Sequence, residues 1–198
     1  MDEIVKQAMA KWPNVPHCYG WLALDARGNW RMRDERAQHF NEAGDKLTNP
    51  ALVGFITRNY QSDEQGRWYF QNGPQRVFVS LECTPFVYRL DDRRAGWRAH
   101  TGVEAGAPTE LLVNDDSLVL VTPLGPGVVL DRDLEFLLDN MHDDAGNRLD
   151  AGFLDRGAQA PRHVEVLGER VSLSRLPVPA VAERFGFVQD PQEGEKDV

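Results

Sequence analysis

The sequence predicts an α+β protein in which an N-terminal α+β roll is followed by a mainly-β, roll-like lobe. Short runs with strand-like alternation outnumber the segments with helical spacing, of which there are about three. Strands and helices do not alternate strictly along the chain, and this disfavours a doubly wound parallel sheet. The 198 residues suffice for one large domain or two small ones, and a hydrophobic content of 41% supports a packed core.

The stretch 66–90 carries the strongest pattern in the chain. Residues 68–71 and 75–82 are predicted strands joined by a turn at 72–74. In the second strand, Val77, Val79 and Leu81 are predicted to face the core, while the opposite face, which includes Glu82, is partly solvated. The Thr84-Pro85 step interrupts this ladder, and a further strand follows at 86–90.

The residues before this stretch predict two helices and a hairpin. Helical spacing over residues 4–12 ends at a proline, and residues 19–25 and 28–33 form a hairpin. A second helix is predicted from Pro50 to about Gln61, with Thr48 or Asn49 as its cap. Residues 34–50 are predicted to be a loop, and a short strand within them is left open.

The chain is predicted to divide into an α+β lobe at 1–91, a mainly-β lobe at 92–188 and a disordered acidic tail at 189–198. The second lobe contains short strands and a turn at 123–127. Its one clear helix is predicted to run to Met141 from a cap at Asp131. A hairpin around Gly168 and a helical turn at 179–185 complete it.

The pattern D-x-x-G-x-W occurs twice, starting at Asp25 and at Asp63. Asp and Gly are the residues that tight turns need, because an Asp side chain bonds to nearby amide groups and Gly accepts a positive φ. Both segments are therefore interpreted as turns that lead into a strand. A structural repeat remains an alternative, although six residues are few to support it.

Composition argues against several classes of function. The net charge is -9, and no run of Lys or Arg offers a basic footprint, so neither nucleic acid nor an anionic membrane surface is an expected partner. The N-terminus does not resemble a secretory signal, and no apolar run approaches the roughly 20 residues of a membrane helix. Two cysteines, Cys18 and Cys83, suggest a reduced pair and hence a cytoplasmic protein.

Several short patterns together resemble a family of uncharacterised proteobacterial proteins of about 200 residues, classified only as a domain of unknown function. They are a hairpin with G-x-W, a helix of the form L-V-x-x-x-I, D-x-x-G-x-W, V-x-V-x-L-E, a T-P-F step, and residues 111–120. The similarity covers residues 18–140 and implies two small lobes, one α+β and one a β-roll. Relatives tend to carry an acidic pair before Pro-Phe, whereas this chain has only Glu82 there. The family implies no established activity.

The chain lacks familiar metal, nucleophile and phosphate motifs. Its five histidines and two cysteines show none of the HxxxH, HExxH or CxxC spacings, so no metal site or cofactor is predicted. There is no G-x-S-x-G, and Cys83 is interpreted as a small buried residue. The Gly-containing loops lack the Lys or helix start that a phosphate site needs, and are interpreted as turns.

Polar side chains gather around aromatic ones in the central stretch, and they define the candidate site. Amide and guanidinium groups beside aromatic rings are typical of a ligand pocket, but also of an ordinary exposed sheet face with cross-strand pairs. Both interpretations are kept. The candidate ligand-binding residues are Arg58, Gln71, Gln75, Arg76, Glu82 and Tyr88.

The function predicted first is a non-catalytic module that binds a small molecule or a partner protein through this polar-aromatic sheet face. The alternatives are a hydrolase that uses Glu82 as acid or base, and a homodimeric scaffold that uses the unpaired edges of short strands. A hydrolase would normally need a second carboxylate or a histidine, and the sequence indicates no partner for Glu82.

Overall fold

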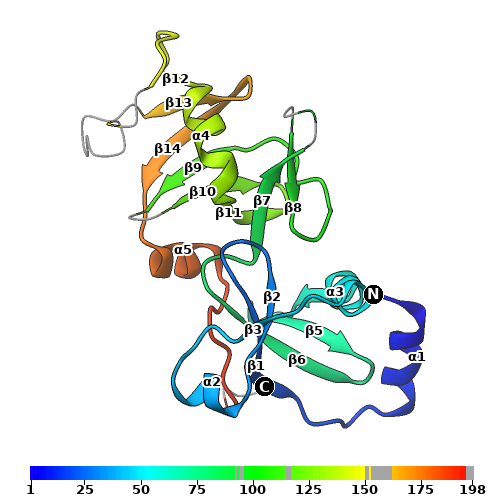
Figure 1. Ribbon diagram of the computed structural model, residues 1–198. Coiled ribbons are helices and arrows are strands. Elements are labelled where there is room, and N and C mark those ends of the chain that lie inside the picture. Colours follow the sequence, from blue (N-terminus) through cyan, green and yellow to red (C-terminus); the bar gives the residue numbers. More distant parts are fainter. Residues whose placement is uncertain (92, 94–95, 115–116, 150–151, 153–161, 195–198) are drawn as a thin grey trace. The chain divides into compact units, whose positions relative to one another are not determined.

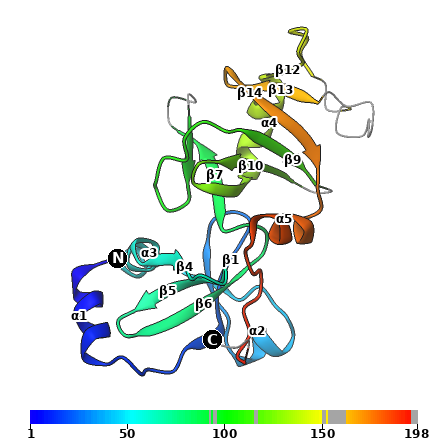
Figure 2. The same cartoon turned by 180° about the vertical axis from the view of Figure 1, so that it is seen from behind.

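The computed structural model describes residues 1–91, 93, 96–114, 117–149, 152 and 162–194 (Figures 1 and 2). Within it the chain forms two compact units. Unit 1 comprises Met1–Pro85 and the chain from Ala182 onward, and unit 2 comprises Phe86–Val181. Each unit combines helices with a sheet of mixed strand direction, so the α+β class is confirmed.

The bounds of the two units differ from those of the predicted lobes, so the predicted division into lobes stays a prediction. The strand Phe86–Leu90 groups with unit 2 because its pairing partners lie there. Of the predicted tail, Gln189 and Asp190 bond back to unit 1: Leu81 N donates to Gln189 O at 2.6 Å and Ser80 Oγ to Asp190 Oδ1 at 2.7 Å. Residues 195–198 lie outside the described residues.

Unit 1 is built on a six-stranded sheet in the order β3-β2-β1-β6-β5-β4. β1 and β6 are parallel, and the other neighbours are antiparallel. The strands are β1 (Cys18–Leu24), β2 (Trp30–Met32), β3 (Asp45–Lys46), β4 (Tyr60–Ser62), β5 (Trp68–Asn72) and β6 (Gln75–Leu81). The predicted β1–β2 and β5–β6 hairpins are both present.

Helix α3 (Pro50–Arg58) packs against one face of this sheet and closes the core of unit 1. Asn49 caps it, because Asn49 Oδ1 accepts from the amides of the second and third residues that follow, at 3.0 and 3.1 Å. The ring of Phe55 meets that of Phe70 edge-on at 5.4 Å, and Val79 beneath is fully buried. The inward face predicted for β6 is therefore the core face at Val79 and Leu81.

The loop predicted at 34–50 is more ordered than the sequence suggested. It contains helix α2 (Glu35–His39), capped by Asp34, whose Oδ1 accepts from Ala37 N at 2.8 Å, and the short strand β3. The predicted helix end at Gln61 is wrong, since α3 ends at Arg58. Residues 60–62 gain more by pairing with β5 as β4, and this tertiary pairing overrides a helical pattern of apolar residues.

Unit 2 holds an eight-stranded sheet in the order β12-β13-β14-β9-β10-β11-β7-β8. Helix α4 (Asp131–Asp139) belongs to it, and α5 (Val178–Phe185) leads back to unit 1. The strands are β7 (Phe86–Leu90), β8 (Trp97–Ala99), β9 (Glu110–Val113), β10 (Leu118–Thr122), β11 (Gly125–Val129), β12 (Met141–His142), β13 (His163–Val166) and β14 (Glu169–Arg175).

Three sequence predictions for unit 2 need correction. The predicted helix end at Met141 is wrong, since α4 ends at Asp139 and Met141 begins β12 and pairs with β13. The turn predicted at 123–127 is shorter, because β11 already begins at Gly125 and pairs with β10. Asp131 is not the cap of α4. Leu130 holds the cap position without a side-chain bond, and Asp133 in the first turn accepts from Leu90 N at 3.0 Å. The helix start is thus fixed by a contact to β7, which local sequence does not reveal.

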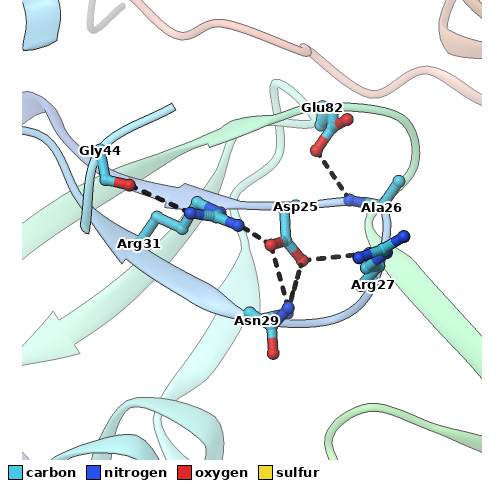
Figure 3. A network of polar contacts seen from close by, with 7 residues as sticks. All are labelled: Asp25, Ala26, Arg27, Asn29, Arg31, Gly44 and Glu82. Carbon is cyan, nitrogen blue, oxygen red and sulfur yellow. Dashed lines mark hydrogen bonds and ion pairs between the residues drawn. The ribbon is translucent and has the colours of Figure 1, made fainter. Parts of the chain in front are cut away.

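Three loops share one hydrogen-bonded arrangement, and they begin at Asp25, Asp63 and Asp143. In each, Oδ1 of the aspartate accepts from the amides two and four residues further on, at 2.8–3.0 Å. The glycine at the fourth position has φ between 76° and 80°. Figure 3 shows the loop at Asp25, where Oδ2 also accepts from Arg31 Nε at 2.7 Å. The turn interpretation of D-x-x-G is confirmed. The third copy, at Asp143, lacks the Trp that ends the pattern of the first two.

Two of these loops sit within a longer repeat of helix, asparagine, short strand and loop. Asn59 ends α3 and its Nδ2 donates to Phe55 O at 2.9 Å, while Asn140 ends α4 and its Nδ2 donates to Phe136 O at 2.8 Å. β4 and the Asp63 loop follow the first asparagine, and β12 and the Asp143 loop follow the second. Each unit therefore contains one copy of this local motif.

The buried carboxylate of Asp25 predicts acid sensitivity of unit 1. Burial on its own raises the pKa of Asp25, but bonds from Asn29, Arg31 and Arg27 outweigh it and leave the pKa below its usual value. A carboxylate with a lowered folded pKa stabilises above its unfolded pKa of about 4, and loses that contribution as the pH falls through the folded pKa. We expect Asp25→Asn to be less stable than the wild type at neutral pH, with the gap narrowing in acid.

Urea unfolding of both proteins between neutral pH and pH values below the unfolded pKa measures this gap. Two stability curves that stay parallel over the whole acid range would show that the Asp25 carboxylate contributes nothing to the pH dependence. Asp143→Asn removes the corresponding aspartate from a loop on the surface of unit 2. Comparing the two variants tests whether the pH-dependent loss of stability comes from the burial of the carboxylate or from the loop conformation.

Candidate functional site

The outer face of the β5–β6 hairpin brings together the polar and aromatic side chains noted in the sequence. In the strand register Gln71 lies opposite Arg76, and Tyr69 lies opposite Phe78. Residues directly opposite in an antiparallel pair project to the same side, so these four share one face, and α3 lies on the other. Phe78 is buried although it faces away from the core, because the ring of Tyr19 stacks on it at 4.7 Å.

This face forms the floor of a cleft of about 690 Å³ in unit 1. The cleft wall comes from helix α1 (Glu3–Lys11) and the chain after it, which run past the hairpin in Figures 1 and 2. Two contacts fix this wall: Ala8 lies against the hairpin turn at Gly73, and Gln75 Nε2 donates to Pro16 O at 3.0 Å. The lining residues used below are Met9, Trp12, His17, Tyr69, Gln71 and Arg76.

Gln71 has a hydrogen-bonding capacity that the fold leaves partly unused. Its side chain is 1% exposed, and its Nε2 donates to Gly73 O at 2.9 Å. Its Oε1 is buried and accepts no hydrogen bond from the described residues. His17 Nδ1 in the same cleft lining is likewise buried and unbonded. A buried acceptor without a partner costs about 1–3 kcal/mol, so such atoms are rare in folded proteins unless a ligand or water serves them.

Arg76 and Arg67 both reach the cleft, but only Arg67 is neutralised. Arg67 is 2% exposed, pairs with Asp63 at 2.8 Å and lies over the ring of Phe78 at 4.6 Å. The guanidinium of Arg76 lies over the ring of Tyr69 at 4.6 Å and forms no ion pair with any described residue. Burial raises the pKa of the Tyr69 hydroxyl, so Tyr69 acts as a neutral aromatic platform. Arg76 thus presents an uncompensated positive charge on a rigid support.

The family of the chain follows from its sequence as a whole. A family model named DUF2944, with the description "Protein of unknown function (DUF2946)", matches residues 1–192. The chain belongs to this family. The resemblance to a family of unknown function is thereby confirmed, and it extends well beyond residues 18–140.

Solved structures of another family are similar to this DUF2944 member. A DUF1285 family protein from Silicibacter pomeroyi has 14% identity and a TM-score of 0.48, covering 87% of this chain and 95% of that one. A DUF1285 family protein from Shewanella baltica also has 14% identity, with a TM-score of 0.38 and coverage of 59% and 88%. No curated protein matches the chain significantly.

The remaining predicted site residues of the DUF2944 member lie apart from the cleft. Arg58 ends α3 and pairs with Asp2 at 3.4 Å, which holds the start of α1. Glu82 lies beside a separate hollow of about 370 Å³, where its Oε2 accepts from Ala26 N at 2.9 Å (Figure 3). Asp25, which also lines that hollow, is engaged by Arg31.

Tyr88 is not brought together with the others, because it belongs to the core of unit 2. It is fully buried, and its hydroxyl bonds to Thr122 Oγ1 and to Gly125 O, each at 2.9 Å. Burial raises its pKa to about 12, although the bond to Thr122 lowers it. Tyr88 was predicted to lie near the site because it follows the central strands closely in the sequence. Nothing in the Thr84-Pro85 step indicates that the chain passes from unit 1 to unit 2 there.

The cleft is also lined by His17, Trp12 and Tyr69, which were not among the predicted site residues. In the described part of the chain no group of three or more His, Cys, Asp or Glu could hold a metal. Tyr69 could have been found, since it has the same strand parity as Gln71. Trp12 could not have been found, because its position depends on how α1 packs.

None of the described helices is long and apolar enough to span a membrane.

Proposed function

We propose that this DUF2944 family member is a cytoplasmic, non-catalytic module that binds a small molecule in the cleft between α1 and the β5–β6 face. Its volume of about 690 Å³ lies within the range of small-molecule sites, which are commonly 300–1,000 Å³. The observation that carries the proposal is the pairing of Gln71 with Arg76: a buried acceptor without a bond stands beside a guanidinium without an ion pair.

The charge of the site supports a small ligand rather than a nucleic acid. Arg76 forms no ion pair with a described residue, but the chain has a net charge of -9, whereas a nucleic-acid surface needs many phosphate contacts. Neither Cys18 nor Cys83 forms a disulfide, which supports the reducing environment proposed. The exposed indole of Trp12 supplies apolar contact area at the cleft wall.

The proposal is tested by thermal shift against a metabolite library, with each hit followed by calorimetry on Arg76→Ala. A hydrogen bond to a charged group is worth about 1.5–3 kcal/mol, so we expect a hit to bind Arg76→Ala roughly 10- to 100-fold more weakly. The matched control is Arg36→Ala in unit 1, an arginine that is 73% exposed and does not line the cleft. Hits with unchanged affinity for Arg76→Ala would place binding elsewhere.

The hydrolase alternative has no support of its own in the geometry. Glu82 is exposed and bonded to a backbone amide, and the other carboxylates that line its hollow are already engaged: Asp25 with Arg31, Glu42 with Arg36, and Asp190 with Ser80. A general acid or base needs a second group poised for the reaction. No specific observation favours the homodimeric scaffold, so neither alternative is proposed as a second function.

A further inference from the structure

The Arg76 guanidinium and Gln71 Oε1 need different ligand groups: the first binds an anion, and the second binds a hydrogen-bond donor. The Arg76 guanidinium is a planar fork that pairs best with the two oxygens of a carboxylate. Gln71 Oε1 can only accept, because Nε2 of the same amide is committed to Gly73 O. A ligand that satisfies both must therefore combine an anionic acceptor with an O–H or N–H donor.

The strand register limits how far apart these two ligand groups can be. Gln71 and Arg76 are directly paired, and the Cβ atoms of such a pair lie about 4.5–5.5 Å apart. Arg76 leans over Tyr69, two residues before Gln71 on the same face, and the Gln71 amide bonds to Gly73, two residues after it. Both groups thus belong to one strand pair, and a small ligand that carries its donor close to its carboxylate can meet both.

One wall of the cleft offers apolar surface to a ligand. Met9, Trp12 and Pro13 belong to this wall, and Trp12 is 51% exposed. Much of the other lining is polar and includes Ser62 and Gln65. Gln71 Oε1 is shielded from solvent, so the ligand donor reaches it only after the side chains that cover it move.

We infer that the ligand of this cleft is a small carboxylate that carries a hydroxyl or amino donor close to the carboxylate, together with an apolar side chain. The carboxylate pairs with Arg76, the hydroxyl or amino group donates to Gln71 Oε1, and the side chain lies against Trp12. This inference rests on the proposed function, because it names the chemical class that the same cleft takes.

Calorimetry with four matched probes tests the inference on the wild-type chain. Phenyllactate and phenylalanine carry both groups, phenylpropanoate lacks the α-donor, and phenyllactamide lacks the carboxylate. We expect at least one of the first two to bind, and phenylpropanoate and phenyllactamide to bind about tenfold more weakly or worse, the ratio that one lost hydrogen bond gives. Phenylpropanoate binding as tightly as phenyllactate would overturn the assignment of Gln71 as the acceptor.

Gln71→Leu provides the second readout. It removes the acceptor but retains a buried side chain of similar size, so the preference for phenyllactate over phenylpropanoate should fall to less than about threefold, while the loss on Arg76→Ala persists. A preference that survives in Gln71→Leu would contradict the inference. Circular dichroism confirms that the variant is folded, and Gln71→Asn, which retains an amide, serves as a second variant if it is not.

The failure of this inference can be told apart from the failure of the proposed function. If none of the four probes binds, yet a library compound of another class stabilises the wild type and not Arg76→Ala, the ligand class is wrong and the binding module stands. If no compound depends on Arg76, both are wrong.

Discussion

Gly66→Ala is expected to destabilise unit 1 by about 3 kcal/mol or more, the sum of backbone strain and a steric clash. Gly66 has φ +76°, which costs an L-residue about 1–2 kcal/mol. A Cβ atom there would also lie 1.8 Å from Gly186 O, a backbone atom that cannot rotate away. The loop and the C-terminal segment must separate to make room.

That separation has a defined consequence for the C-terminal segment. Val188 N donates to Gly66 O at 3.0 Å, and the next residue, Gln189, accepts from Leu81 N. We therefore expect the amide protons of Val188 and Leu81 to lose hydrogen-exchange protection in Gly66→Ala before those of the α3 core do.

Gly146→Ala is the matched control, because Gly146 stands at the same position of the third loop with φ +80° and nothing within 4 Å of a new Cβ. It keeps the strain and lacks the clash, so it should cost only about 1 kcal/mol in urea unfolding. If both variants lost the same free energy of unfolding, the clash with the C-terminal segment would contribute nothing to the destabilisation by Gly66→Ala.

Gly127→Ala is expected to destabilise unit 2 by about 3 kcal/mol, for a purely steric reason. Gly127 lies in the middle of β11, and its φ is not in the left-handed region. A Cβ atom would come within 2.3 Å of the ring of Tyr88, which occupies the space that a side chain would need. The ring cannot turn aside without breaking the bonds of its hydroxyl to Thr122 and Gly125.

A double-mutant cycle with Tyr88→Leu isolates this clash. With the ring removed, Gly127→Ala should cost less than about 1 kcal/mol more than Tyr88→Leu alone, so the coupling between the two sites is large. Hydrogen exchange of amides in β10 and β11 reports on unit 2 itself, which matters because a chain with two units need not unfold in a single step. If the two substitutions lowered the free energy of unfolding additively, a contact other than the Tyr88 ring would be the reason why position 127 requires glycine.

Local patterns were sufficient to predict a large part of the secondary structure. The Asn49 cap with Pro50, the β1–β2 and β5–β6 hairpins, and the turns that begin at Asp25 and Asp63 all depend on residues within a few positions of one another. Their energies come from side-chain bonds to neighbouring amides and from glycine's freedom at positive φ, both of which the sequence displays. The third loop, at Asp143, depends on the same local contacts although no Trp follows its glycine.

The candidate site was predictable only in part. Gln71 and Arg76 were selected from the sequence, and strand parity puts them on one face. Arg58, Glu82 and Tyr88 were selected by the same nearness in sequence, but an ion pair to Asp2, a bond to the Ala26 amide and the core of unit 2 hold them elsewhere. No local sequence signal shows where these three side chains lie, because each position is set by a partner dozens of residues away in the sequence.

The α+β class, most of the helices and strands, and membership of the family can be inferred from the sequence alone. Only the folded chain shows that β1 and β6 run parallel in one sheet, that the chain returns to unit 1 within α5, and that α1 turns the Gln71–Arg76 face into a cleft. Turns and caps are fixed by neighbours along the chain. Long-range pairing and packing depend instead on which surfaces together bury the most apolar area, and that is settled only when the whole chain folds.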